Sequence, residues 1–184
     1  MPAFSLEAML AAIEKFKVTE LLTPPPVAVM IIKSPLVSKY DVSSIKYLLC
    51  GAAPLAKETS LQLEGVFEKS KATVRQGYGM TEATCSITLF EPGQVDETRA
   101  GVGYLCANMQ ARIVDDDMND VGYGQVGEAL VRGPNVFKGY WHNEGATKDA
   151  FTEDGWLKTG DYVEVRPDGL FTIVDRKKVS QIGP

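Results

Sequence analysis

The stretch IKYLLCGAAPLAKETSLQLEGVFEKSKATVRQ, residues 45–76, decides the fold class. Its apolar run at 45–50 predicts a buried strand, and the small residues at 51–54 predict a tight turn. The next segment has helical spacing, with one apolar face made of Leu55, Thr59, Leu63, Val66 and Phe67. TVRQ at 73–76 predicts a second strand. Strand, helix and strand in this order indicate a parallel sheet and an α/β fold.

The preceding residues extend the same pattern towards the N-terminus. Residues 5–17 predict an amphipathic helix, with Ser5 as its N-cap and an acidic residue in the first turn. Residues 18–22 predict a short buried strand. The prolines at 24–26 then suit the first turn of another helix, which we expect to end at Ser34-Pro35.

The pattern changes after about residue 95, where short alternating runs are separated by turn-forming residues. MQARIV at 109–114 alternates, and the turn at 166–169 predicts a hairpin between two further strands. We therefore expect residues 1–95 to form a partial α/β subdomain and 96–174 to form a small antiparallel sheet or barrel-like subdomain.

Composition excludes several classes of protein. The net charge of −5 argues against a nucleic-acid partner, which usually requires a basic face. Three widely spaced cysteines fit neither a disulfide framework nor a zinc site, and they favour a reducing compartment. No run of 18 apolar residues and no secretory signal is present, so we expect a cytoplasmic location. A single histidine, His142 in a predicted surface loop, weakens triad and multi-histidine interpretations.

The segment QGYGMTE, residues 76–82, has residue types that suit a nucleotide site. Gly77 and Gly79 allow close approach of the main chain to a ligand, and Tyr78 offers a ring for stacking on a base. Thr81 can donate to a phosphate oxygen, and Glu82 is a carboxylate ligand of the kind that Mg²⁺ prefers. By itself the segment favours a structural turn over a nucleotide site, because a glycine-flanked loop is a weak motif.

Other loops carry the same ambiguity. Residues 51–54 could let a flat ligand lie against the main chain, or could form a plain strand-to-helix turn. Asp161 could accept hydrogen bonds from ribose hydroxyls, or could be an ordinary turn aspartate. The acidic run 115–117 predicts a solvated turn, because Met118 and Asn119 break the spacing of a calcium loop.

Taken together, these segments resemble the adenylate-forming (AMP-binding) superfamily, in particular fungal and plant 4-coumarate–CoA ligase-like acyl-CoA synthetases. Nearly the whole chain takes part in the resemblance. The segments that carry it are CGAAPL (50–55), QGYGMTE (76–82), GQVGEALVRGPNVFKGYW (124–141), DGWLKTGD (154–161) and DGLFTIVDRKK (168–178).

The resemblance implies an ATP-dependent acid–CoA ligase with Mg²⁺ as cofactor and coenzyme A as co-substrate. A carboxylic acid would react with ATP to give acyl-AMP, and coenzyme A would then displace AMP. By motif, Gly51, Ala52 and Ala53 would line the adenine and acyl pocket, and adenine and the carboxylate would be surrounded by Gln76, Gly77, Tyr78, Gly79 and Met80.

The remaining motif positions imply more specific roles. Thr81 would contact the α-phosphate, and Glu82 would hold Mg²⁺. Asp161 and Arg176 would bind the ribose hydroxyls. Asp175–Lys178 would begin the hinge to a mobile C-terminal domain, so that residues 175–184 form a truncated hinge.

The sequence also departs from the family pattern. The serine-, threonine- and glycine-rich phosphate loop of the family would precede residue 1, and its catalytic lysine would follow the hinge. We therefore expect a fragment that is inactive alone. The alternatives are an AMP- or acyl-AMP-binding module, which pairs with the missing segments in trans, and a non-functional product.

The acyl substrate stays open between aryl and fatty acids. Plant coumarate ligases follow the Met-Thr-Glu-Ala motif with Gly-Pro, whereas this chain has Thr84 and Cys85 there. We expect the Cys85 side chain in a pocket or core, and not as a nucleophile, because the sequence places no base to activate it.

Overall fold

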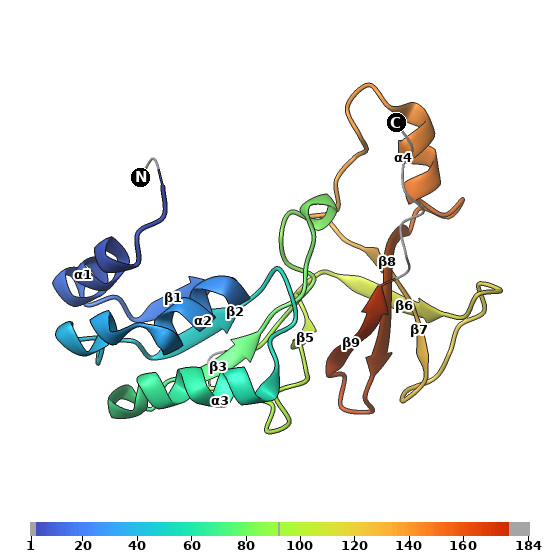
Figure 1. Ribbon diagram of the computed structural model, residues 1–184. Helices are drawn as coiled ribbons and strands as arrows, with labels where there is room; N and C mark the ends of the chain where they lie inside the picture. Colours follow the sequence, from blue (N-terminus) through green and yellow to red (C-terminus); the bar gives the residue numbers. More distant parts are fainter. Residues whose placement is uncertain (1–2, 92, 177–184) are drawn as a thin grey trace. The chain divides into compact units, whose positions relative to one another are not determined.

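The computed structural model describes residues 3–91 and 93–176. The chain forms two compact units, unit 1 (Met1–Gly77 and Phe90–Ala100) and unit 2 (Tyr78–Leu89 and Gly101–Pro184). A parallel sheet with helices in unit 1 and an antiparallel sheet in unit 2 confirm the α/β class (Figure 1). The subdomain boundaries expected at residues 95 and 175 stay predictions.

Unit 1 contains a three-stranded parallel sheet in the order β1-β2-β3. Its strands are β1 (Glu20–Thr23), β2 (Tyr47–Cys50) and β3 (Thr73–Gln76). Three α-helices and two 3₁₀-helices lie between and before them: α1 (Leu6–Phe16), α2 (Pro25–Lys33), η1 (Pro35–Lys39), α3 (Lys57–Val66) and η2 (Glu68–Ser70).

Local sequence signals account for most of these boundaries. The Ser5 hydroxyl accepts a hydrogen bond from the Ala8 amide and caps α1, as predicted. Pro25 and Pro26 occupy the first turn of α2. The buried face of α3 differs from the prediction, because the helix begins at Lys57. Leu55 therefore precedes the helix, and Ser60 is buried in place of Thr59.

One apolar core holds unit 1 together. It draws fully buried side chains from the helices and from the sheet, among them Leu10, Ile31, Leu48, Leu63 and Phe67. In β1 and β2, buried residues alternate with more exposed ones, so one face of the sheet meets this core. Burial of each large apolar side chain stabilises the unit by about 1.5–3 kcal/mol.

Unit 2 contains a four-stranded antiparallel sheet in the order β6-β7-β8-β9, and a two-stranded sheet of β4 and β5. Of the two predicted alternatives, the structure has the open sheet, and within the described residues β6 and β9 do not pair to close a barrel. Its elements are η3 (Thr81–Ala83), β4 (Thr88–Leu89), β5 (Tyr104–Leu105), β6 (Gln110–Val114), β7 (Val126–Arg132), α4 (Glu144–Ala150), β8 (Leu157–Val165) and β9 (Phe171–Arg176).

The predicted hairpin joins β8 to β9. Gly169 adopts φ +87° and donates its amide to the Arg166 carbonyl, and the Asp168 carboxylate accepts from the Leu170 amide. Strand register shifts between Tyr162 and Val163, which is typical of a β-bulge.

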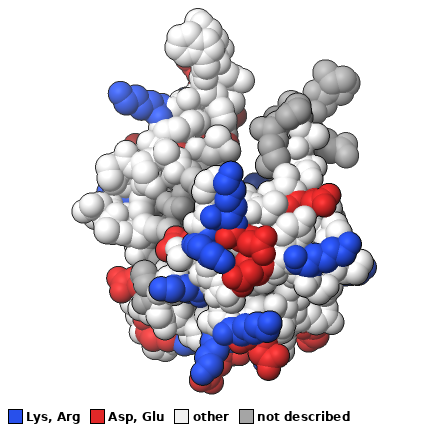
Figure 2. Space-filling model, turned by 90° about the vertical axis from the view of Figure 1, so that its left-hand side faces the viewer, with Lys and Arg blue, Asp and Glu red and all other residues white. Residues whose placement is uncertain are grey.

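Basic and acidic side chains are intermixed on the face that Figure 2 shows. Lys17 Nζ and Asp41 Oδ2 form an exposed ion pair at 2.7 Å. In the part of the chain that the structure describes, no helix is long and apolar enough to cross a membrane.

Candidate functional site

In unit 1, the Gly51–Ala53 loop and Gly77, the first residue after β3, lie side by side at the carboxyl ends of β2 and β3. These strands are parallel neighbours, with Cys50 paired to Gln76. The Gly77 amide donates to the Cys50 carbonyl at 3.1 Å. A Cβ atom on Gly51 would lie 3.9 Å from the Gly77 carbonyl oxygen, which is ordinary contact. The chain therefore leaves both strands at the same edge of the sheet, where parallel sheets commonly bind ligands.

The loop after β2 presents mainly its backbone. Ala52 has φ +71°, a left-handed conformation that is uncommon for a residue with a side chain. Ala52 and Ala53 are exposed, and Gly51 is half-buried. Small side chains leave the peptide groups of this loop accessible, which suits the close approach of a planar ligand.

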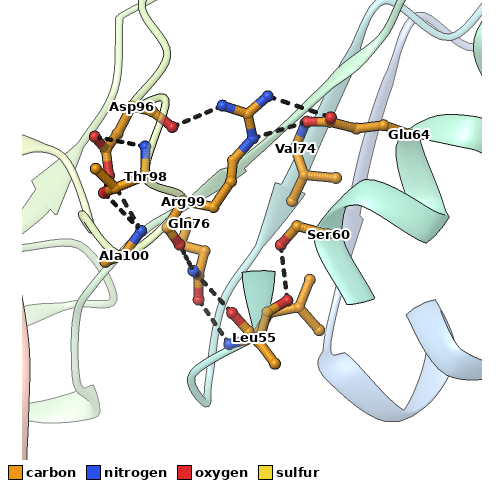
Figure 3. A network of polar contacts seen from close by, with 10 residues as sticks. Leu55, Ser60, Glu64, Val74, Gln76, Asp96, Thr98, Arg99 and Ala100 are labelled. Carbon is orange, nitrogen blue, oxygen red and sulfur yellow. Dashed lines mark hydrogen bonds and ion pairs between the residues drawn. The ribbon is translucent and has the colours of Figure 1, made fainter. Parts of the chain in front are cut away.

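Gln76 is buried at the end of β3, and its side-chain amide contacts the main chain at two places (Figure 3). Its Oε1 accepts from the Leu55 amide at 2.7 Å. Its Nε2 donates to the Leu55 carbonyl at 3.1 Å and to the Arg99 carbonyl at 2.7 Å. The side chain thus joins β3 to the end of the Gly51–Leu55 loop and to a later segment of unit 1.

Tyr78, Asp161 and Arg176 come together in unit 2. The Tyr78 hydroxyl donates to Asp161 Oδ2 at 2.7 Å, and Arg176 Nε lies 3.3 Å from Asp161 Oδ1. The Asp161 side chain is 9% exposed and that of Arg176 is 68% exposed. Burial, followed by smaller contributions that include the Asp161 hydrogen bond, raises the pKa of Tyr78 well above its ordinary value. Both oxygens of this buried carboxylate therefore have a polar neighbour.

The position of Asp161 corrects the turn interpretation. Asp161 lies inside β8, directly opposite Arg176 of β9. Its amide donates to the Thr159 hydroxyl at 3.1 Å, and that hydroxyl donates to the Ala129 carbonyl. A pair of neighbouring strands thus fixes the carboxylate, which is more rigid than a surface turn.

Glu82 lies in η3, the short 3₁₀-helix that begins at Thr81. The Tyr140 hydroxyl donates to Glu82 Oε1 at 2.8 Å, and the Phe137 amide donates to the Glu82 carbonyl at 2.7 Å. Burial, and then the Glu82 hydrogen bond, raise the pKa of Tyr140. The Thr81 side chain is exposed, and Met80 packs against an apolar cluster of unit 2.

Gly79 is required by close packing of the main chain. A Cβ atom at this position would lie 1.4 Å from the Cys85 carbonyl oxygen. No side chain can be accommodated there without moving the 81–86 turn, so Gly79 has a structural reason to be glycine, whether or not a ligand is bound.

The hydrogen bonds between Asn135 and the 81–86 turn had no signal in the sequence. Asn135 Nδ2 donates to the carbonyls of Ala83 and Ser86, at 2.9 and 3.0 Å. The Thr84 hydroxyl donates in return to the Asn135 carbonyl at 2.6 Å. Together with Tyr140, Asn135 fixes the turn that contains Glu82. Only the GPNVFKGY motif marked this segment, and it did not indicate which residues it would meet.

The remaining predicted residues have simpler surroundings. His142 is exposed, as expected, and lies before α4. Asp115 accepts from the amides of Asp117 and Asn119, which confirms a turn. Cys85 is exposed, so the expected placement in the core is wrong, whereas the alternative of a pocket stays a prediction. Lys177 and Lys178 of the predicted hinge lie outside the described residues.

Comparison with known proteins identifies relatives along most of the chain. Residues 1–141 match the family model of the AMP-binding enzyme. A probable 4-coumarate–CoA ligase 3 of Dictyostelium discoideum is 40% identical over 97% of this chain and 32% of that protein. Peroxisomal OPC-8:0-CoA ligase 1 of Arabidopsis thaliana is 37% identical over 95% of this chain and 32% of that protein. The chain thus spans about a third of the length of these curated relatives.

Solved structures give the same result. A luciferase-like enzyme from the mealworm Zophobas morio has a TM-score of 0.83 and 30% identity, over 95% of this chain and 42% of that one. ATP-bound MatB from Rhodopseudomonas palustris has a TM-score of 0.83 and 30% identity, over 97% of this chain and 34% of that one. On the strength of the family model, the relatives and these structures, the chain belongs to the AMP-binding enzyme family.

Proposed function

We propose that the protein to which this chain corresponds is an ATP-dependent acid–CoA ligase, and that this chain contributes a large part of its nucleotide site. A carboxylate oxygen would attack the α-phosphorus of ATP, so that pyrophosphate leaves and acyl-AMP forms. The sulfur of coenzyme A would then attack the acyl carbon, so that AMP leaves and a thioester forms. Because the chain spans about a third of its relatives, the complete reaction is proposed for the whole protein and nucleotide binding for this chain.

One observation carries the proposal: the Asp161 carboxylate is buried, fixed by two strands and bounded by Tyr78 and Arg176. A buried carboxylate is retained at a considerable desolvation cost unless it is paired. Here its ion-pair partner, Arg176, is largely exposed and can rearrange to admit a ligand. Adjacent ribose hydroxyls are suitable donors to such a carboxylate. We therefore assign ribose binding to Asp161 and Arg176.

The Gly51–Ala53 loop and Gly77 are proposed to approach the adenine ring through their peptide groups. The exposed alanines and the glycines leave room for a planar ring against the main chain. Within unit 2, the Tyr78 hydroxyl holds Asp161, and the Tyr78 ring is proposed for stacking on a base. Gly79 and Met80 follow Tyr78 in the 76–82 loop and are proposed to maintain the conformation of that loop.

Glu82 and Thr81 are proposed to face the phosphates. Magnesium commonly binds nucleotides through one or two carboxylates, together with the phosphate oxygens and water. Glu82 fits this pattern, because its half-buried carboxylate accepts one hydrogen bond from Tyr140 and keeps further lone pairs. The described residues include no group of three or more ligating side chains, so Glu82 would act with the substrate phosphates. Bound Mg²⁺ would neutralise the charge that develops on phosphorus.

The acyl substrate is proposed only as a carboxylic acid. The names of the relatives include coumarate and OPC-8:0, an aromatic and a non-aromatic acid, so they favour neither class. A cytoplasmic location, with a peroxisomal one as the alternative, and a hinge beginning at 175 are likewise proposed.

Isothermal titration of the purified chain with AMP tests the nucleotide-site proposal directly. We expect binding in the millimolar range or tighter, and weaker binding of 2′-deoxyadenosine monophosphate, which lacks one proposed donor to Asp161. Carboxylate-dependent exchange of pyrophosphate into ATP tests the reaction, and we expect little or none from the chain by itself. Absence of heat with millimolar AMP would overturn the assignment of this site.

A further inference from the structure

We infer that Gln76 is a positioning residue, which holds the Gly51–Leu55 loop and the segment 96–100 of unit 1 in place, and that its amide does not donate to the nucleotide. The inference deepens the proposed function and rests on it for the nucleotide, but the positioning role can be tested without any ligand. It replaces the family-based expectation that Gln76 surrounds adenine and the carboxylate.

The donor capacity of the Gln76 side chain is already used. A primary amide has two N–H donors. In Gln76 these two donors go to the carbonyls of Leu55 and Arg99, at 3.1 and 2.7 Å. Its carbonyl oxygen accepts from the Leu55 amide at 2.7 Å and retains only a second lone pair. A nucleotide could receive a hydrogen bond from Gln76 only if one of these bonds were broken.

The Gln76 side chain forms a reciprocal pair of hydrogen bonds with the main chain of Leu55, as two paired strand residues do. Leu55 both donates to and accepts from the same side chain, so its peptide groups are fixed in position and direction. Gln76 is 7% exposed and Leu55 is 6% exposed, so water cannot readily replace these bonds. The loop begins at Gly51, next to Gly77, and ends at Leu55, so both of its ends are attached to the end of β3.

The third contact of Gln76 leads into a polar network that fixes the segment 96–100 (Figure 3). Arg99 has φ +60°, an uncommon conformation for a residue with a side chain. Its guanidinium binds both oxygens of Glu64, at 3.1 and 3.2 Å, and donates to the Asp96 carbonyl at 2.7 Å. These bonds hold the Arg99 carbonyl where Gln76 can reach it.

The same network closes the outer edge of β3. Glu64 Oε1 also accepts from the Val74 amide at 2.8 Å, and this amide lies on β3 itself. The Asp96 carboxylate accepts hydrogen bonds from the Ala100 amide and from the Thr98 hydroxyl, and these bonds stabilise the turn at 96–100. Gln76 is therefore the point at which a rigid network meets the proposed adenine loop, and this arrangement favours a positioning role over direct contact.

Hydrogen exchange of the full chain tests the positioning role. We expect Gln76→Met, which keeps the length of the side chain without its polar atoms, to accelerate exchange of the Leu55 amide at least about tenfold. Amides in β1 should keep their rates. Gln62→Met on the exposed face of α3 is the matched control. It should change the exchange rates of neither the Leu55 amide nor the amides of β1. Unchanged exchange at Leu55 in Gln76→Met would overturn the inference.

Competition between two nucleotides separates positioning from contact. AMP and inosine monophosphate differ in the groups that adenine presents to a donor or acceptor. If Gln76 only positions the loop, Gln76→Met weakens both nucleotides by a similar factor, about fivefold, and leaves their affinity ratio within about twofold of wild type. A change of more than about tenfold in that ratio would show direct recognition and would overturn the inference.

A measurement on the unmodified chain covers the case in which Gln76→Met does not fold. The two Nε2 protons of Gln76 should exchange slowly in its NMR spectrum and should keep their chemical shifts when AMP is added. Fast exchange of these protons, or a large shift with AMP, contradicts the inference. A chain that binds neither nucleotide overturns the proposed function, whereas the exchange experiments still decide whether Gln76 positions the loop.

Discussion

Units 1 and 2 hold their candidate site residues in different ways. In unit 1 the buried Gln76 side chain binds the main chain of Leu55 and Arg99, and the exposed surface of the loop is mostly peptide. In unit 2 the side chains bind each other, as Tyr78 and Arg176 do around Asp161. Unit 1 thus holds main-chain peptide groups in a defined geometry, whereas unit 2 supplies a charged carboxylate and side-chain hydrogen bonds.

The difference follows from the two kinds of sheet. Loops at the end of a parallel sheet must turn sharply into helices, which favours small residues and main-chain contacts. Neighbouring antiparallel strands place side chains directly opposite each other, as with Asp161 and Arg176. Substitutions in unit 1 should therefore change loop geometry, while those in unit 2 should change ligand contacts, and the following experiments test that contrast.

Thiol labelling gives the largest expected contrast between the units. Cys50 of β2 is buried, and burial raises the pKa of its thiol to about 11. Cys85 of unit 2 is exposed. At pH 8 only about a thousandth of Cys50 is the reactive thiolate, and burial restricts access as well. We expect iodoacetamide to modify Cys50 at least about a thousandfold more slowly than Cys85, as followed by peptide mass spectrometry.

The sign of the pH dependence follows from that raised pKa. Because the folded thiol keeps its proton when the unfolded one has lost it, its contribution to stability is present below about pH 9 and is lost as the pH rises to about 11. Denaturation in urea should abolish the difference in labelling rate. Equal labelling rates in the native chain would show that unit 1 does not hold a closed core.

Breaking the Arg99–Glu64 pair is expected to have the next largest effect. The two side chains are only 13% and 16% exposed, so removing one leaves the other charge largely buried. We expect Arg99→Met to destabilise unit 1 by about 3 kcal/mol, as measured by urea denaturation. The double variant with Glu64→Met should recover part of the loss. The exposed Lys17–Asp41 pair is the control, and Lys17→Met should change stability little.

A loss from Arg99→Met as small as that from Lys17→Met would contradict the proposed rigidity of the segment 96–100. A large loss accompanied by unchanged exchange at Leu55 would separate the stability of this network from its action on the loop. The first result would show that the Arg99–Glu64 network does not stabilise unit 1. The second would show that the network stabilises unit 1 without acting on the loop through Gln76.

Local patterns in the sequence were sufficient for much of unit 1. The apolar run at 45–50 and the TVRQ segment gave β2 and β3, and their parallel order followed from the helix between them. Ser5 marked the start of α1, and the turn at 166–169 marked the hairpin in unit 2. In each of these cases the cause of the structure lies within a few neighbouring residues.

The arrangement within the candidate site could not be derived in the same way. Tyr78 meets Asp161, and Tyr140 meets Glu82, across 83 and 58 residues of sequence. Such contacts depend on how distant strands pack, which periodicity and turn propensity do not encode. The family motifs indicated the candidate site residues, but they did not indicate that Asp161 lies in a strand or that both side-chain N–H groups of Gln76 are already hydrogen-bonded.

Substitution of Asp161 tests the directed bonds of unit 2. Asp161→Asn keeps the shape of the side chain but removes the charge that Arg176 and the proposed ribose hydroxyls meet. We expect the affinity for AMP to fall about fiftyfold, since hydrogen bonds to charged groups contribute about 1.5–3 kcal/mol. The preference for AMP over its 2′-deoxy analogue should also be lost in calorimetry. Asp149→Asn on exposed α4 is the matched control. A preserved preference for AMP would remove Asp161 from the site.

The smallest effect is expected at Tyr140. Tyr140→Phe removes the 2.8 Å hydrogen bond to Glu82 but keeps the ring, which packs edge-to-face on Phe137 with centroids 4.9 Å apart. Stability should change little, and AMP binding without metal should not change. Mg²⁺ should increase the affinity for ATP by a factor that is about threefold smaller in Tyr140→Phe than in the parent chain. The reason is the lost hydrogen bond, since one net hydrogen bond contributes about 1 kcal/mol. Tyr123→Phe, at an exposed turn, is the control.

Absorbance at 295 nm gives an independent measure of the same contact. Burial and the Glu82 hydrogen bond raise the pKa of Tyr140, so Glu82→Gln should move it back towards the ordinary value. The folded phenol keeps its proton at a pH where the unfolded one has ionised. Its stabilising contribution is therefore present below the ordinary pKa and is lost as the pH rises through the raised value. If Glu82→Gln leaves the titration of Tyr140 unchanged, the hydroxyl does not hold the carboxylate, and Glu82 has to be fixed by the Phe137 amide alone.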